Sequence, residues 1–79
     1  MWYVYILKSL QKDWYYVGHT FNKTSRLKYH NNKKVRSTRP YAPFIIVYTE
    51  EFGTKGEAFK REQQIKSFKH GEAFKKLVA

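Results

Sequence analysis

The stretch "YVYILKSLQKDWYYVGHT", residues 3–20, decides the architecture of the N-terminal half of the chain. Two apolar, tyrosine-rich runs, residues 2–7 and 14–18, lie on either side of a short polar segment. Each run is too short for a typical helix and is rich in aromatic and β-branched residues, as buried strands are. Because the break between them is short, the two runs predict an antiparallel β-hairpin.

The middle of the chain predicts a helix, a loop and a third strand. Thr20 or Asn22 can cap a helix that runs to about residue 31. Residues 31–43, "NNKKVRSTRPYAP", contain both prolines and no apolar run, which predicts an exposed loop. Residues 44–48, "FIIVY", are apolar throughout and predict a strand at the centre of the sheet.

Two further helices are predicted after this strand. "TKGE" at residues 54–57 matches a capping box, and the helix that it starts should reach about residue 69. Gly71 suits the left-handed position that closes such a helix, and residues 72–78 predict a short last helix. The order β-β-α-β-α-α predicts an α+β fold, with a small three-stranded, mainly antiparallel sheet flanked by three helices. We expect residues 1–79 to form one domain.

The composition narrows the classes of partner. Sixteen Lys and Arg face six acids, for a net charge of +10, which favours a polyanion such as nucleic acid. The absence of cysteine excludes disulfides and thiolate metal sites. No apolar run approaches the roughly 20 residues of a membrane helix, and the N-terminus lacks the pattern of a signal peptide. We therefore expect a cytoplasmic protein without a membrane partner, and a membrane-surface role is a weak alternative.

Glu62 is the most informative single residue of the sequence. At about 100° per residue, it falls inside the apolar arc that Ala58, Phe59, Ile65 and Phe68 form on the second predicted helix. A carboxylate that faces a core is costly unless it is paired or bound to a metal. The alternative is a glutamate at the edge of the arc that reaches outward to Lys66, four residues later.

Arg26 and His30 can point at one place, because they are four residues apart on the first predicted helix. Arginine binds phosphate through a bidentate fork, although a solvated basic face would show the same spacing. Strand alternation puts Tyr5 on one face of the first strand, and Tyr16 and Gly18 on one face of the second. These tyrosine faces could meet, and the alternative is an aromatic pair that only packs.

These features resemble a known family. "YVY" at residues 3–5 and "YVG" at residues 16–18 resemble the paired motifs of the GIY-YIG nuclease superfamily, and "AFKREQQIKS" at residues 58–67 resembles its glutamate-bearing helix. The chain is most similar to the small stand-alone bacterial proteins related to the nuclease domain of the excinuclease C subunit. Two features depart from the family pattern: Tyr3 replaces the first motif glycine, and no asparagine follows Asn32, where many members carry a late one.

The resemblance implies a metal-dependent endonuclease that hydrolyses the phosphodiester bonds of DNA, either structured or single-stranded. One Mg²⁺ or Mn²⁺ ion would bind Glu62, and Arg26 would stabilise the phosphate. Tyr5 or Tyr16 would take the proton of water, with its pKa lowered by the ion and by Arg26. His30 would orient a tyrosine or contact phosphate. The implied catalytic set is therefore Tyr5, Tyr16, Arg26, His30 and Glu62, with Gly18 as the motif glycine.

The basic loop is the predicted nucleic-acid contact. We expect its four cations to hold the phosphate backbone: Lys33, Lys34, Arg36 and Arg39. The same charge would also suit a binding module that has the nuclease fold and little or no catalysis, which is the alternative function.

Overall fold

The computed structural model describes all residues, 1–79, and confirms the predicted α+β fold with the order β-β-α-β-α-α. Strands β1 (Trp2–Ser9) and β2 (Tyr15–Thr20) form the predicted antiparallel hairpin. Strand β3 (Phe44–Phe52) pairs antiparallel with the other side of β1, so that the sheet order is β2-β1-β3.

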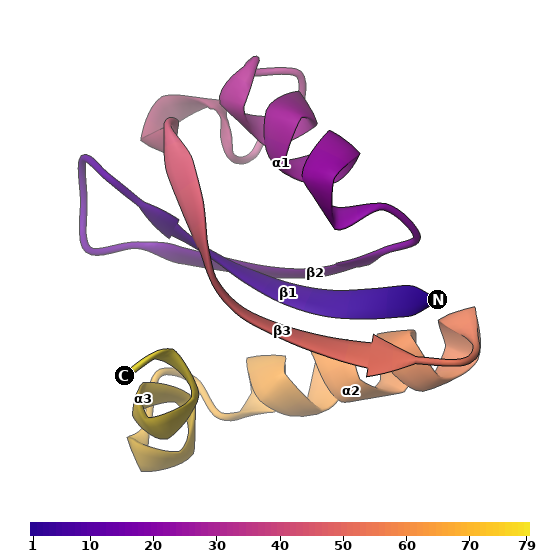
Figure 1. Cartoon of the computed structure of the whole chain (residues 1–79). Coiled ribbons are helices and arrows are strands. Elements are labelled where there is room, and N and C mark those ends of the chain that lie inside the picture. The colour runs from indigo at the N-terminus through magenta and orange to yellow at the C-terminus, as the bar shows by residue number, and fades with distance from the viewer.

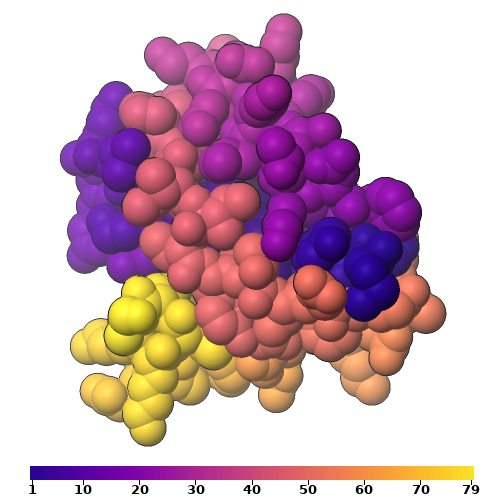
Figure 2. All heavy atoms as spheres, in the orientation of Figure 1, coloured from indigo at the N-terminus to yellow at the C-terminus, as the bar shows by residue number.

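The prediction that β3 is central is wrong, because β1 occupies that position. Four consecutive residues of β1, Val4 to Leu7, are at most 2% exposed, as expected of a strand that is paired on both sides and covered on both faces. The apolar run of β3 instead lies at an edge, and its Ile45 is 44% exposed. Figure 2 shows this strand running across the visible surface between the helical layers.

Helix α1 (Lys23–Asn31) covers one face of the sheet, and helices α2 (Lys55–Ser67) and α3 (Glu72–Val78) cover the other (Figure 1). Side chains of β1 alternate between the two faces. One core cluster therefore packs under α2 and α3, and its buried members are Val4, Ile6, Val17, Ala58, Ile65 and Phe74. The second cluster packs on the α1 side, and its buried members are Tyr5, Leu7, Ala42 and Phe44.

The caps position the helices on these faces. The side chain of Asn22 accepts a hydrogen bond from the Ser25 amide at 3.0 Å, and Thr54 accepts one from the Glu57 amide at 3.2 Å. The left-handed position predicted for Gly71 is wrong, since its φ is −75° and it starts α3. Lys69 and His70 have positive φ instead. A Cβ at Gly71 would lie 3.1 Å from the Phe68 carbonyl oxygen, so close backbone approach explains this glycine.

The segment predicted as an exposed loop is partly built into the core. Thr38 is fully buried, and Ala42 is 3% exposed. A short 3₁₀ helix, Arg39–Tyr41, stacks the Tyr41 ring on Trp14 with the ring centroids 3.9 Å apart. The prediction failed because single residues, such as the Tyr41 ring, hold this segment against the core. The sequence of the segment contains no apolar run that would predict such burial.

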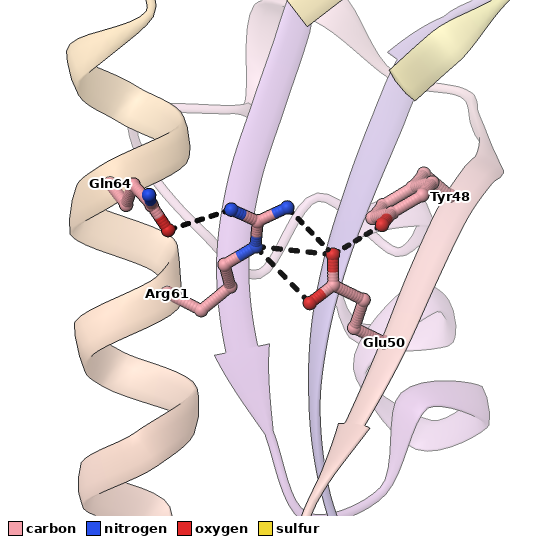
Figure 3. A network of polar contacts seen from close by, with 4 residues as sticks. All are labelled: Tyr48, Glu50, Arg61 and Gln64. Atoms are coloured by element: carbon pink, nitrogen blue, oxygen red, sulfur yellow. Dashed lines mark hydrogen bonds and ion pairs between the residues drawn. The ribbon is translucent and has the colours of Figure 1, made fainter. Parts of the chain in front are cut away.

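A polar network joins α2 to the edge strand β3 (Figure 3). Arg61 donates through Nε to both carboxylate oxygens of Glu50, at 3.1 Å each, and through Nη2 to Oε2 at 3.0 Å. The Tyr48 hydroxyl donates to the same Glu50 carboxylate, and Gln64 accepts from Arg61 Nη1 at 2.7 Å. This network ties the helix that carries Glu62 to the sheet.

Candidate active site

The two motif tyrosines meet on the α1 side of the hairpin. Tyr5 on β1 lies directly opposite Gly18 on β2, and the ring centroids of Tyr5 and Tyr16 are 6.2 Å apart. A Cβ at Gly18 would lie 2.6 Å from the Tyr5 hydroxyl oxygen and 2.8 Å from Cζ. The missing side chain of Gly18 therefore makes room for the end of the Tyr5 ring.

A buried chain of hydrogen bonds holds Tyr5. Its hydroxyl lies 3.2 Å from His30 Nε2, and His30 Nδ1 lies 2.9 Å from Thr38 Oγ1. Thr38 donates its own proton to the Val35 carbonyl at 3.4 Å, so its oxygen accepts from His30 Nδ1–H. His30 Nε2 then carries the free lone pair and accepts a hydrogen bond from the Tyr5 hydroxyl.

Burial reinforces these protonation states. Desolvation, with a smaller contribution from Arg26, lowers the pKa of His30 to about 4. Desolvation also raises the pKa of Tyr5 to about 12, against the lowering effect of Arg26. Arg26 lowers the pKa of Tyr5, as expected, but desolvation outweighs this effect and the net shift is upward. His30 is fully buried, which places it against Tyr5 and out of reach of a phosphate in solvent.

Arg26 sits at the solvent side of the tyrosine pair. Partial burial lowers the pKa of its guanidinium, but polar contacts with Tyr5 and Tyr16 outweigh that effect and raise it. The guanidinium also lies over the Tyr29 ring, 5.1 Å from its centroid. The motif tyrosines thus orient an arginine that remains partly accessible.

Glu62 reaches the same edge of the sheet from the α2 side. It is 5% exposed, which confirms the inward direction, and it also pairs with Lys66 as in the alternative, with Nζ 2.7 Å from Oε2. His19 Nδ1 lies 2.6 Å from the other oxygen, Oε1. The carboxylate is near enough to Tyr5 to contribute to the raised pKa of that phenol. Both halves of the site are attached to strand β2: Tyr16 and Gly18 turn to its α1 face, and His19, the partner of Glu62, turns to its α2 face.

Two residues of this site were missed in the sequence. Thr38 is one, and nothing in "RSTRP" signals its burial. His19 is the other, and a signal existed: it follows Gly18, so alternation turns it to the face opposite Tyr16, toward α2. Phe59 was placed in the apolar arc of α2, but it is 50% exposed and packs edge-on to His19, with the centroids 5.6 Å apart.

The donor set at Glu62 fits a hard divalent cation that keeps most of its water. A carboxylate oxygen is the ligand that Mg²⁺ and Mn²⁺ prefer, and the chain forms no cluster of three or more His, Cys, Asp or Glu side chains. Glu62 is the one buried acid of the chain, and it would be the carboxylate that holds such an ion. Both carboxylate oxygens of Glu62 already have partners. His19 lies at Oε1, and Lys66 and Gln63 lie at Oε2, with Gln63 Nε2 at 3.2 Å.

Two of the three surface hollows lie beside α1 and α2. The hollow beside Arg26 has a volume of about 290 Å³, and its lining is Thr20, Phe21, Asn22, Ser25, Arg26 and Tyr29. A larger hollow of about 560 Å³ lies along the side of α2 that carries Arg61, and it contains none of the predicted catalytic residues. The smaller hollow is the one that can place a ligand against the site.

The predicted nucleic-acid contacts are on the surface. The four cations of the loop after α1 are all exposed, and none forms an ion pair: Lys33, Lys34, Arg36 and Arg39. None of the helices has the length and apolar character needed to cross a membrane.

A sheet that pairs two motif tyrosines, with an arginine on the following helix and an inward glutamate on a later one, defines a GIY-YIG-type catalytic domain. The chain belongs to this family: the model described as the GIY-YIG catalytic domain matches residues 1–73. Family membership implies a nuclease-type function on nucleic acid, and such nucleases generally depend on a divalent metal.

Several small proteins named UPF0213 are similar to this chain. One from Staphylococcus haemolyticus is 37% identical over 76 residues, covering 95% of this chain and 92% of its own. One from Natronomonas pharaonis is 36% identical over 78 residues, covering 98% and 89%. One from Clostridium perfringens is 45% identical over 65 residues, covering 81% and 69%. No solved structure gives a significant match to the chain.

Proposed function

We propose that this protein is an endonuclease that hydrolyses phosphodiester bonds of DNA with one divalent ion bound at Glu62. The observation that carries the proposal is that two sets of groups lie on either side of the edge strand β2. Arg26 and the tyrosine pair lie on one face, and the buried carboxylate of Glu62 lies at the other. A phosphate at this edge would have a cation-binding carboxylate and a guanidinium within one small area.

The proposal gives the two tyrosines different roles. Tyr5 is 2% exposed, keeps its proton and donates a hydrogen bond to His30. Because it also contacts Arg26, we assign it to positioning that guanidinium. Tyr16 is only partly buried, and we assign it to the proton of the attacking water. Arg26 would bind the non-bridging oxygens of the phosphate and stabilise the charge that builds up in the transition state. Mg²⁺ or Mn²⁺, when bound, would supply Lewis-acid stabilisation of the phosphate and of the leaving oxygen.

The surroundings favour a nucleic acid with unpaired nucleotides near the cut. Phe21 is 62% exposed and Tyr29 is 47% exposed, and both line the hollow beside Arg26. Exposed aromatic rings beside cations stack on unpaired bases without regard to sequence. The loop cations would follow the backbone, and we expect the protein to meet its substrate in the cytoplasm.

A binding module without catalysis is the second candidate, and one observation favours it. The Glu62 carboxylate is already satisfied by His19 and Lys66, so the fold does not need a metal there. A module of this kind would use the same loop cations and the same hollow.

Cleavage assays separate the two candidates. Purified protein is incubated with labelled single-stranded, branched and duplex DNA and matching RNA, in Mg²⁺, Mn²⁺ or EDTA. We expect cleavage that needs the metal and is lost in Glu62→Gln, with binding retained. Metal-independent cleavage, or full activity of Glu62→Gln, would overturn the proposal; binding without cleavage by the wild type would establish the binding module.

A further inference from the structure

Lys66 lies against one oxygen of the Glu62 carboxylate. Its Nζ lies 2.7 Å from Oε2, at a carboxylate whose side chain is only 7% exposed. The opposite oxygen, Oε1, faces His19 Nδ1 at 2.6 Å. The carboxylate therefore has a nitrogen partner on each oxygen. Lone pairs remain on both oxygens, but an ammonium 2.7 Å from Oε2 repels a second cation, so a metal ion binds more tightly once Lys66 has moved away.

The two partners differ in how firmly they are held. The His19 ring packs between Trp2, 6.2 Å away, and Phe59, 5.6 Å away between centroids, and its side chain is 22% exposed. The Lys66 side chain is 46% exposed, and its ammonium is carried on a flexible four-carbon stem. Lys66 can move into water without disturbing the core, whereas His19 cannot.

We propose that Lys66 is the internal counter-ion of Glu62, and that a divalent ion binds by exchange with it. This inference rests on the proposed function, because it concerns the same carboxylate. The ammonium neutralises Glu62 while the site has no metal, which lets an inward carboxylate fold without its ion. The exchange also makes metal binding weak until a substrate phosphate adds its own ligands. Lys66 is thus a positioning residue that sets metal affinity.

The test compares substitutions of Lys66 with a matched substitution on the same helix. Lys66→Gln removes the ammonium, and Lys66→Arg replaces it with a guanidinium that can bind the carboxylate through two hydrogen bonds. Lys60→Gln is the control, because it removes the same charge from α2 at an exposed residue that makes no ion pair. Free Mn²⁺ is measured by electron paramagnetic resonance in titrations of each protein, and thermal unfolding in EDTA verifies that each is folded.

We expect Lys66→Gln to bind Mn²⁺ about 2- to 5-fold more tightly than Lys60→Gln, the range that a partly exposed ion pair corresponds to. Lys66→Arg should bind more weakly than the wild type. Equal affinities for the Lys66 and Lys60 variants would overturn the exchange but leave the proposed function standing, provided that Glu62→Gln abolishes binding. Mn²⁺ binding that survives Glu62→Gln would overturn both, because the ion would then bind elsewhere.

Discussion

Gly18→Ala tests whether the tyrosine pair depends on a missing side chain. The new Cβ would lie 2.6 Å from the Tyr5 hydroxyl oxygen, 2.8 Å from its Cζ and 3.0 Å from Cε2 of Tyr16. Carbon and oxygen atoms do not approach so closely, and the Tyr5 ring is 2% exposed and has no free space to enter. The ring or strand β2 must shift, at a cost of about 1–3 kcal/mol of unfolding free energy. For a domain of this size, each kcal/mol lowers the Tm by about 4–8 °C.

The same shift should reach the site. Displacing the Tyr5 hydroxyl breaks its 3.2 Å contact with His30 and removes one of the two phenols beside Arg26. Cleavage should therefore fall by more than the loss of folded protein explains. Gly56→Ala is the control, since a Cβ there meets nothing within 4 Å and lies in α2. It should leave the Tm unchanged or raise stability by up to about 1 kcal/mol. A Gly18→Ala protein that unfolds within 1 °C or so of the wild type and cleaves normally would refute the reasoning.

Four other outcomes follow from the site. Glu62→Gln should abolish metal-dependent cleavage and lower stability by about 1–3 kcal/mol, because Lys66 and His19 lose a charged partner; unchanged denaturation midpoints would contradict the pairing. The folded pKa of His30, about 4, lies below its unfolded value, so only the unfolded state gains a proton as the pH falls from about 6.5 to 4. Stability should fall by about 3 kcal/mol over that window in urea titrations, and His30→Gln should remove most of this slope. Arg26→Ala should reduce cleavage far more than affinity, and equal losses would make Arg26 an ordinary backbone contact. Binding should weaken steeply with salt, and Lys33→Gln should lower the slope of log K against log salt by about 1, measured by fluorescence anisotropy; an unchanged slope would remove Lys33 from the interface.

The fold was predictable where local pattern decides it. The two short apolar runs, residues 2–7 and 14–18, and the short break between them gave the hairpin. The capping residues gave the starts of α1 and α2, with Asn22 rather than Thr20 as the cap of α1. The position of β3 was not predictable in the same way. An apolar run such as that of β3 is typical of a central strand. Sheet order, however, depends on pairing between residues about 40 positions apart, and it is β1 that pairs with a strand on each side.

In the candidate site, too, local patterns were predictable and long-range contacts were not. The inward direction of Glu62 follows from the spacing of Ala58 and Ile65 on one helix, and the structure shows all three buried. The support of Tyr5 could not be found in this way. It requires His30 on α1 and Thr38 in a basic loop to meet at one point under the sheet, and neither residue has a local pattern that marks its burial.

Burial gives the two motif tyrosines different surroundings, and this is why the proposed mechanism gives them different roles. From sequence, both are phenols near an arginine, and a cation should lower the pKa of either. In the fold, Tyr5 lies under α1 with its hydroxyl bonded to a neutral His30, and desolvation outweighs Arg26 and raises its pKa to about 12. A phenol held protonated in this way cannot accept a proton from water near neutral pH. It can fix the Arg26 guanidinium and the Gly18 backbone beside it, while Tyr16, on the next strand and closer to solvent, is left to face the water. In the proposed mechanism, the hydrogen-bonded chain of Tyr5, His30 and Thr38 would therefore act through geometry, by holding the arginine against which the phosphate would be placed.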